Sequence, residues 1–145
     1  MQKQVKLKKL SPDAVIPTYA REWDAGADLY ATEAVELYPG EYRLVGTGIA
    51  VEVPVGFVGL IHPRSGLSAK NGITVLNAPG TIDAGYRGEL KVILINLDKY
   101  KPFKVEKGDR IAQFVLQEVA VAEFIEVEEL SDSVRQDGGF GSSGA

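Results

Sequence analysis

The chain has 145 residues, enough for one domain with a substantial core, and its 45% hydrophobic and 25% charged content is ordinary for a globular protein. It has no cysteine and one histidine, which excludes disulfides and thiolate metal sites and argues against a zinc centre or a Ser-His-Asp triad. A net charge of -4 argues against a nucleic-acid partner, and no apolar run could cross a membrane. The absence of cysteine suits the cytoplasm, where we expect the protein to be.

Short strands separated by turns dominate the first sixty residues. The segment 5–8 alternates apolar and polar residues, as a half-buried strand does, and an irregular connection with two prolines follows it. Further strands are expected at 35–37, 42–45, 49–53 and 57–61, divided by Pro and Gly. Because no segment shows a long helical period, the pattern predicts an all-β sandwich or barrel.

One carboxylate, Asp28, stands among small residues in the segment 25–31, A-G-A-D-L-Y-A. Magnesium prefers oxygen ligands and keeps part of its hydration shell, so Asp28 could hold this metal through water. The alternative is an aspartate that accepts hydrogen bonds from backbone amides in a turn.

One short helix is expected within 62–72, H-P-R-S-G-L-S-A-K-N-G, with Ser65 as its N-cap and Asn71-Gly72 as a left-handed end. Its start combines features that suit a phosphate. Gly66 allows close approach, Ser65 adds a hydroxyl, and Arg64 adds a charged fork. The alternative is a capped connector helix whose arginine pairs with a surface carboxylate.

The segment 77–90 reads N-A-P-G-T-I-D-A-G-Y-R-G-E-L and is predicted to be a tight β-hairpin. The open end of such a hairpin displays main-chain groups that a planar polar ligand could pair with. Asp83 would serve as a proton acceptor and Tyr86 as a flat wall. The alternative is an ordinary surface hairpin with a solvated aspartate.

Strands are also expected at 91–95, 110–116 and 121–127, which completes a single domain over residues 1–130. Gln113 and Arg110 lie in an otherwise apolar strand and need polar partners, because burying an unpaired polar group is costly. Gln113 could contact a ligand, whereas Arg110 could pair with Asp109 or across a subunit interface.

The tail 131–145 has too few apolar residues to fold by itself and is expected to be mobile. It nevertheless carries Arg135 and Phe140 around a glycine pair, followed by Gly141-Ser142-Ser143-Gly144, which is similar to an anion-binding loop. We therefore expect an arm that closes over a ligand, with a plain flexible terminus as the alternative.

Five of these stretches, in this order, resemble the five motifs of the trimeric dUTPase family. They are A-G-A-D-L at 25–29, P-R-S-G-L at 63–67, G-T-I-D-A-G-Y-R-G-E at 80–89, G-D-R-I-A-Q at 108–113 and R-Q-D-G-G-F-G-S-S-G at 135–144. One departure is visible, since Gln136 stands where the fifth motif usually has glycine. The resemblance implies a distorted jelly-roll-like β-barrel that forms a homotrimer with an exchanged C-terminal arm.

The resemblance also implies an activity, the Mg²⁺-dependent hydrolysis of dUTP to dUMP and pyrophosphate, which keeps uracil out of DNA and supplies dUMP for dTTP synthesis. By this similarity Asp83 is the general base for in-line attack of water on the α-phosphorus, and Asp28 anchors the metal through water. The remaining implied substrate contacts are Arg64, Ser65, Gly66 and Gln113 with phosphates, Asn77, Gly80, Thr81 and Ile82 with uracil, Tyr86 beneath the deoxyribose, Lys91 beside the hairpin, and Arg135, Phe140, Gly141 and Ser142 from another subunit.

Three rival readings differ in activity. A dCTP deaminase of the same superfamily is disfavoured because Asp83 and Tyr86 match the dUTP-hydrolysing pattern. A non-catalytic nucleotide sensor would not need the base. A carbohydrate-binding β-sandwich would need exposed aromatic side chains for sugars to stack on. This alternative is disfavoured because only 8% of the residues are aromatic, and most of these lie within expected strands.

Overall fold

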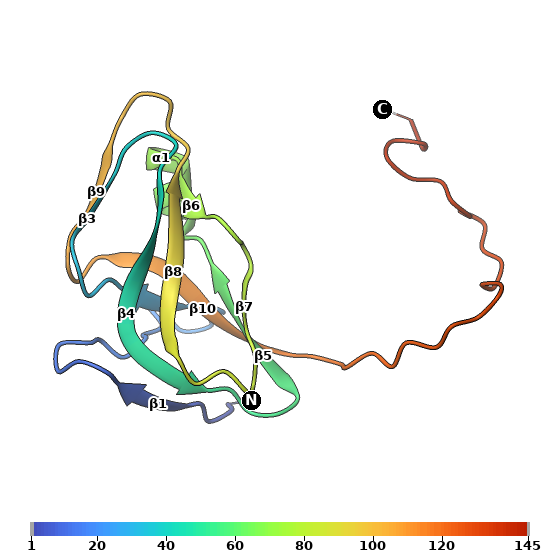
Figure 1. Cartoon of the computed structure of the whole chain (residues 1–145), viewed down its shortest axis with the longest axis horizontal. Helices are drawn as coiled ribbons and strands as arrows, with labels where there is room; N and C mark the ends of the chain where they lie inside the picture. Colours follow the sequence, from blue (N-terminus) through green and yellow to red (C-terminus); the bar gives the residue numbers. More distant parts are fainter. Residues whose placement is uncertain (1, 145) are drawn as a thin grey trace.

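A computed structural model describes residues 2–144, which form ten strands and one short helix (Figure 1). The elements are β1 (Lys6–Lys9), β2 (Ala27–Tyr30), β3 (Val35–Leu37), β4 (Tyr42–Glu52), β5 (Phe57–His62), α1 (Ser65–Asn71), β6 (Ile73–Val75), β7 (Gly80–Ile82), β8 (Glu89–Asn96), β9 (Phe103–Val105) and β10 (Arg110–Glu118). No helix within this range is long and apolar enough to cross a membrane.

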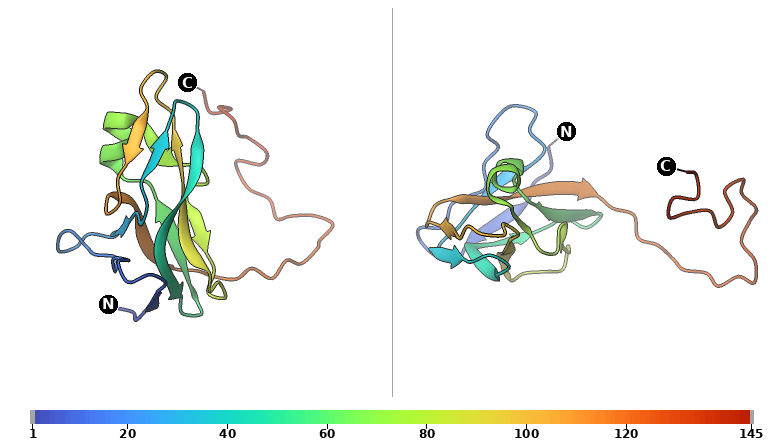
Figure 2. Two further views of the ribbon diagram at one scale, coloured as in Figure 1. Left: turned by 60° about the vertical axis from the view of Figure 1, so that its left-hand side comes forward. Right: turned by 90° about the horizontal axis from the view of Figure 1, so that it is seen from above.

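The strands build two four-stranded antiparallel sheets, ordered β1-β4-β8-β6 and β2-β10-β5-β7, and a small β3-β9 ribbon. The two larger sheets wrap around a shared core, and α1 lies at one end of the body (Figures 1 and 2). The ladders do not close into a continuous cylinder. The all-β prediction with a single short helix is confirmed.

The core consists of aliphatic side chains from the facing sides of these strands. Strand β8 shows the period-2 alternation clearly: Leu90, Val92 and Leu94 are buried, whereas Lys91 is exposed. Removing this apolar surface from water is the main stabilising term, at roughly 25 cal/mol for each Å² buried. The core residues with at most 1% exposure are Leu29, Leu37, Val45, Ile49, Ile73, Leu90, Val92, Leu94, Val105, Ile111 and Ala112.

The predicted hairpin over 77–90 is wrong in its pairing. Strand β7 pairs with β5, with Gly59 opposite Ile82, while β8 pairs with β4 in the other sheet. The residues 83–88 therefore carry the chain from one sheet to the other instead of closing a two-stranded ladder. Turn signals and strand propensity show where the chain changes direction, but they do not select the partner strand.

The helix ends as predicted but begins differently. Gly72 follows its last turn in the left-handed conformation, with φ of 66°, and donates its N–H to the Ser68 carbonyl at 3.1 Å. The N-cap is Arg64, without a side-chain capping bond, and Ser65 is the first helical residue. The predicted capping role of Ser65 is therefore wrong, which leaves its hydroxyl available for another partner.

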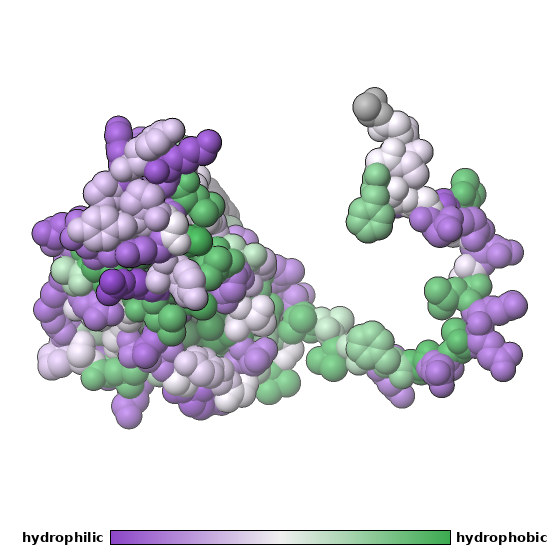
Figure 3. Space-filling model, turned by 45° about the horizontal axis from the view of Figure 1, so that its top comes forward, coloured by the Kyte–Doolittle hydropathy of each residue, from purple (hydrophilic) through white to green (hydrophobic). Residues whose placement is uncertain are grey.

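The strand predicted at 121–127 does not form. Beyond the hydrogen bond from the Val119 N–H to the Gly56 carbonyl, at 3.0 Å, no hydrogen bond or ion pair within residues 2–144 joins the C-terminal segment to the body. Both sides of β10 are already occupied, by β2 and β5, and the segment 121–127 pairs with none of the outer strands β1, β6, β2 and β7 of the described chain. The segment runs away from the body and exposes its apolar side chains, drawn green in Figure 3.

Candidate functional site

A cluster of charged and polar side chains forms around Asp28, which is buried and only 3% exposed. The Arg64 Nε lies 3.3 Å from its Oδ1, and the Arg110 Nη1 lies 3.8 Å from its Oδ2. Gln113, directly opposite Asp28 in the β2–β10 ladder, donates its side-chain N–H to Oδ1 at 3.4 Å. Two guanidinium groups against one carboxylate leave a net positive charge, which suits an anion.

Arg64 is held by the main chain as well as by this ion pair. Its Nη1 donates to the Arg110 carbonyl at 3.3 Å, but its buried Nε has no aligned hydrogen-bond acceptor in spite of the nearby carboxylate. A buried donor without an acceptor is unusual in a folded protein, and it marks Arg64 as a candidate ligand contact. A hollow of about 270 Å³ opens beside it, lined by Arg64, Leu67, Phe103, Asp109, Arg110 and Ile111.

Ser65 and Gly66 stand exposed at the start of α1, next to Arg64. A Cβ added at Gly66 would meet no atom within 4 Å. The space at this glycine is therefore open, and a ligand could approach the backbone closely there. The predicted phosphate-contacting residues Arg64, Ser65, Gly66 and Gln113 thus lie together with Asp28.

Two residues of this cluster were missed or misread in the sequence. Gly26 is required because a Cβ at that position would lie 2.9 Å from both Cβ and Oε1 of Gln113. Arg110 contacts Asp28 instead of Asp109, whose carboxylate accepts the Glu106 N–H at 2.8 Å. A register shift in β10 between Arg110 and Ala112 redirects Arg110, and a bulge of this kind leaves no trace in the alternation of residue types.

A second hollow of about 270 Å³ surrounds Asp83 and Tyr86, and Lys91 reaches it from β8. The Tyr86 hydroxyl donates to the Glu89 carbonyl at 2.8 Å. The ring fits because position 88 is glycine, where a Cβ would overlap the Tyr86 hydroxyl. The hollow is lined by Leu44, Thr81, Ile82, Asp83, Tyr86, Glu89, Lys91 and Ile93.

Strand β7 is the outer strand of its sheet, so one side of Gly80–Ile82 has no partner strand. Its free edge presents main-chain N–H and C=O groups, which a planar heterocycle could pair with. Asn77 lies in the turn before β7, and its amide is 3.4 Å from where a Cβ of Gly80 would be. The open edge and the Asn77 amide together are suited to bind the polar edge of a nucleobase.

The two hollows lie apart within one chain and share no lining residue. The pairing of Gly59 with Ile82 places Asp83 toward the Phe57 end of β5, whereas Arg64 follows the other end at His62. At about 3.3 Å per residue, the two positions are separated by roughly 20 Å along the strand. Within one copy of the chain, Asp83, the predicted general base, therefore lies far from the arginines around Asp28.

The predicted arm residues Arg135, Phe140, Gly141 and Ser142 contact neither hollow. Arg135 Nε donates to the Gly138 carbonyl at 2.6 Å, and the Phe140 side chain is fully exposed. Gln136 has a positive φ of 50°, a left-handed conformation that favours glycine. This is the physical reason why a glycine suits that position of the fifth motif.

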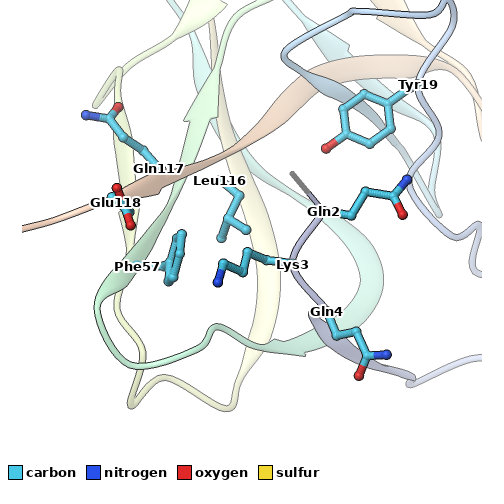
Figure 4. A pocket seen from close by; sticks show the side chains of 8 residues that line it. All are labelled: Gln2, Lys3, Gln4, Tyr19, Phe57, Leu116, Gln117 and Glu118. Atoms are coloured by element: carbon cyan, nitrogen blue, oxygen red, sulfur yellow. The ribbon is translucent and has the colours of Figure 1, made fainter.

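A larger hollow of about 940 Å³, at the N-terminal end, contains none of the predicted site residues (Figure 4). The Lys3 ammonium group there lies 5.5 Å from the centroid of the Phe57 ring. Within residues 2–144, no group of three or more His, Cys, Asp or Glu side chains could hold a metal ion by itself.

Comparisons with known proteins point to one family. A family model described as dUTPase matches residues 12–144. A deoxyuridine 5'-triphosphate nucleotidohydrolase of Thermobifida fusca (strain YX) is 57% identical over 141 residues, covering 97% of this chain and 79% of that protein. The corresponding protein of Rhodococcus erythropolis (strain PR4 / NBRC 100887) is 58% identical over 140 residues, covering 97% of this chain and 85% of that protein.

Solved structures agree. A Staphylococcus bacteriophage 80alpha dUTPase with dUpNHpp has a TM-score of 0.92 and 34% identity, covering 99% of this chain and all of that one. A dUTPase mutant from phage phi11 of S. aureus, described as showing the coordination of a structural Mg(II) ion, has a TM-score of 0.81 and 30% identity, covering 88% of this chain and 98% of that one.

Proposed function

Because this chain belongs to the dUTPase family, we propose that it hydrolyses dUTP to dUMP and pyrophosphate. The reaction would keep uracil out of DNA and supply dUMP for dTTP synthesis, in the cytoplasm. The observation that carries the proposal is a pair of half-sites. One is the hollow around Asp83 and Tyr86, with a free carboxylate beside an open strand edge, and the other is the hollow beside Arg64 and Arg110, with two clustered cations.

Asp83 acts as the general base. Its side chain is exposed, and no hydrogen bond or ion pair within residues 2–144 engages its carboxylate, so it is free to accept a proton from water. The water oxygen then bonds to the α-phosphorus, the bond to the pyrophosphate oxygen breaks, and the proton passes to Asp83. Removal of the proton makes the water a stronger nucleophile.

The triphosphate is held by the cluster around Asp28. Arg64 and Gln113 supply charged and neutral N–H donors, and the Ser65 hydroxyl and the backbone at Gly66 add further contacts. Arg110 increases the positive charge next to the same carboxylate. These groups favour the bound triphosphate and the pyrophosphate that leaves.

The same cluster suits a magnesium ion that is coordinated mainly by the phosphates, and not one coordinated mainly by protein side chains. Its oxygen donors are the single Asp28 carboxylate and the Gln113 amide, too few for a site of their own but suited to hold metal-bound water. Bound Mg²⁺ would neutralise phosphate charge and fix the triphosphate conformation.

The uracil base and the deoxyribose bind at the other half-site, the hollow around Asp83 and Tyr86. The main chain of Gly80, Thr81 and Ile82, with Asn77, pairs with the polar edge of uracil, and the narrow edge excludes a 5-methyl group. Tyr86 lies beneath the deoxyribose, where its ring would clash with a 2′-hydroxyl, and Lys91 borders the same hollow.

The complete site requires several copies of the chain, which we propose to be a homotrimer with its sites between subunits. The separation of Asp83 from Arg64 supports this assembly, because one bound triphosphate must reach both. Arg135, Phe140, Gly141 and Ser142 would come from the arm of another copy, with Phe140 stacked on uracil. Residues 1–130 would form the domain, and 131–145 the closing arm.

The test is pyrophosphate release from dUTP, dCTP, dTTP and UTP, each with Mg²⁺ and with the metal removed by EDTA. Release from dUTP alone, and only with Mg²⁺, is expected. Formation of dUTP and ammonia from dCTP would indicate a dCTP deaminase. Binding of dUpNHpp without any turnover would indicate a nucleotide sensor.

A further inference from the structure

The loop 83–88, which carries the predicted base, has little main-chain support. It leaves β7 in one sheet and enters β8 in the other, so no ladder spans it. A single main-chain hydrogen bond within the loop, from the Tyr86 N–H to the Asp83 carbonyl at 3.0 Å, closes its turn. A Cβ added at Gly85, at its tip, would meet no atom within 4 Å, so no other part of the chain packs against the tip, and the loop depends on side chains for a fixed shape.

The Arg87 guanidinium provides that support. Its Nη1 donates to the Ala84 carbonyl at 2.6 Å and to the Tyr86 carbonyl at 3.1 Å, on the two sides of Gly85. Its Nη2 lies 3.5 Å from the Oε1 of Glu52, the last residue of β4. The side chain thus ties the turn together and joins it to the β1-β4-β8-β6 sheet.

We infer that Arg87, anchored by Glu52, is the positioning residue that holds Asp83 for attack on the α-phosphorus. The inference rests on the proposed dUTP hydrolysis. Neither side chain lines the hollow around Asp83, so both act through the backbone of the turn and not by touching the substrate.

The chemistry of arginine is specific to this task. The planar guanidinium can bond two carbonyls and a carboxylate at once, whereas a lysine ammonium lacks this fixed fork. An exposed ion pair such as Arg87–Glu52 adds little to global stability by itself. The consequence of losing it is therefore expected in the geometry of the turn and not in the stability of the fold.

The effect should fall on turnover and spare binding. Strand β7, which reads the base, is held by its ladder with β5 and does not depend on Arg87. A loosened turn displaces only the carboxylate, and a misplacement of about 1 Å can reduce the rate by up to about a hundredfold. We expect kcat to fall while KM for dUTP and the affinity for dUpNHpp stay the same.

The experiment compares Arg87→Met, Arg87→Lys and Glu52→Gln with the full-length protein. For Arg87→Met we expect a fall in kcat of about tenfold or more, a smaller fall for the other two, and a change of less than about twofold in the Kd for dUpNHpp. Lys6→Met is the matched control, because Lys6 also pairs with Glu52, at 3.9 Å, but does not reach the turn. It should retain wild-type kcat.

Amide hydrogen exchange tests the positioning directly, without relying on turnover. In Arg87→Met, a peptide covering 83–88 should exchange faster, while peptides from β5 and β7 keep their wild-type rates. Unchanged exchange in that loop, or wild-type kcat in Arg87→Met, would overturn the inference. If the wild-type protein fails to hydrolyse dUTP, the proposed function fails, and the exchange result still decides whether Arg87 holds the turn.

Discussion

Asp28 and Asp83 are both carboxylates of the candidate site, but their surroundings give them different tasks. Asp28 is buried between two guanidinium groups, and its carboxylate holds the Arg64 and Arg110 side chains beside it. Asp83 is exposed and unpartnered in the described chain, so its carboxylate can accept a proton. Burial and partners, more than residue type, distinguish the carboxylate proposed to hold the arginines from the one proposed to accept the proton.

The substitution Asp83→Asn should remove the base and preserve the shape of the loop. We expect kcat for dUTP to fall by about 10²–10⁴-fold, the usual contribution of a general base, with unchanged affinity for dUpNHpp. Pyrophosphate release and calorimetric titration measure the two effects.

The control is Asp98→Asn, in the turn after β8, where the N–H groups of Tyr100 and Lys101 lower the pKa of the carboxyl. This variant should keep its turnover. Intact turnover in Asp83→Asn would remove Asp83 from its proposed role.

At the scale of elements, Asn96 joins three parts of the fold. It lies at the end of β8 with no exposed surface, and its Nδ2 donates to the carbonyls of Leu37 in β3 and Lys101 before β9, both at 2.9 Å. Its Oδ1 accepts the Asp98 N–H at 2.9 Å. The β3-β9 ribbon, which has no ladder to either large sheet, is linked to β8 through this amide.

Replacing Asn96 with alanine should leave the buried Leu37 carbonyl and the partly buried Lys101 carbonyl without their partner and open a small cavity. We expect a loss of about 2–3 kcal/mol in the free energy of unfolding. Urea denaturation at fixed protein concentration measures it. Asn71→Ala, at the exposed end of α1, should change stability by less than about 0.5 kcal/mol. Equal stability of the two variants would show that the amide network does not hold the ribbon.

At the scale of the whole molecule, one chain displays two half-sites and an unused apolar segment. Val121, Phe124 and Ile125 are each at least 74% exposed, which is unusual for a row of large apolar side chains. A neighbouring copy would cover them and would also bring Asp83 and Arg64 together. The proposed assembly would thus complete both the packing and the candidate site.

Deleting residues 135–145 should reduce turnover of dUTP without changing the melting temperature or the mass of the assembly. The reason is that these residues make no hydrogen bond or ion pair with the body in the described chain, but carry the groups proposed to close the site. Steady-state kinetics, thermal melting and light scattering separate the effects. A lower melting temperature would show that the arm stabilises the fold, and unchanged kinetics would show that it does not close the site.

The sequence by itself determined the fold class, because the alternation of strand residues is local, and it also marked the residues predicted to form the site. Alternating strands, a left-handed helix end at Gly72 and the motifs around Asp28, Arg64 and Asp83 are all visible as residue types at short spacing. The unusual Gln136 was visible too, although the cost of its positive φ was not.

Only the tertiary structure decided which segments pair. Strand β7 joins β5 instead of β8, a bulge in β10 turns Arg110 toward Asp28, and the segment 121–127 pairs with no strand of the described chain. Each depends on contacts between residues distant in the sequence, where sheet edges compete for partners. Local propensity does not encode the outcome of that competition.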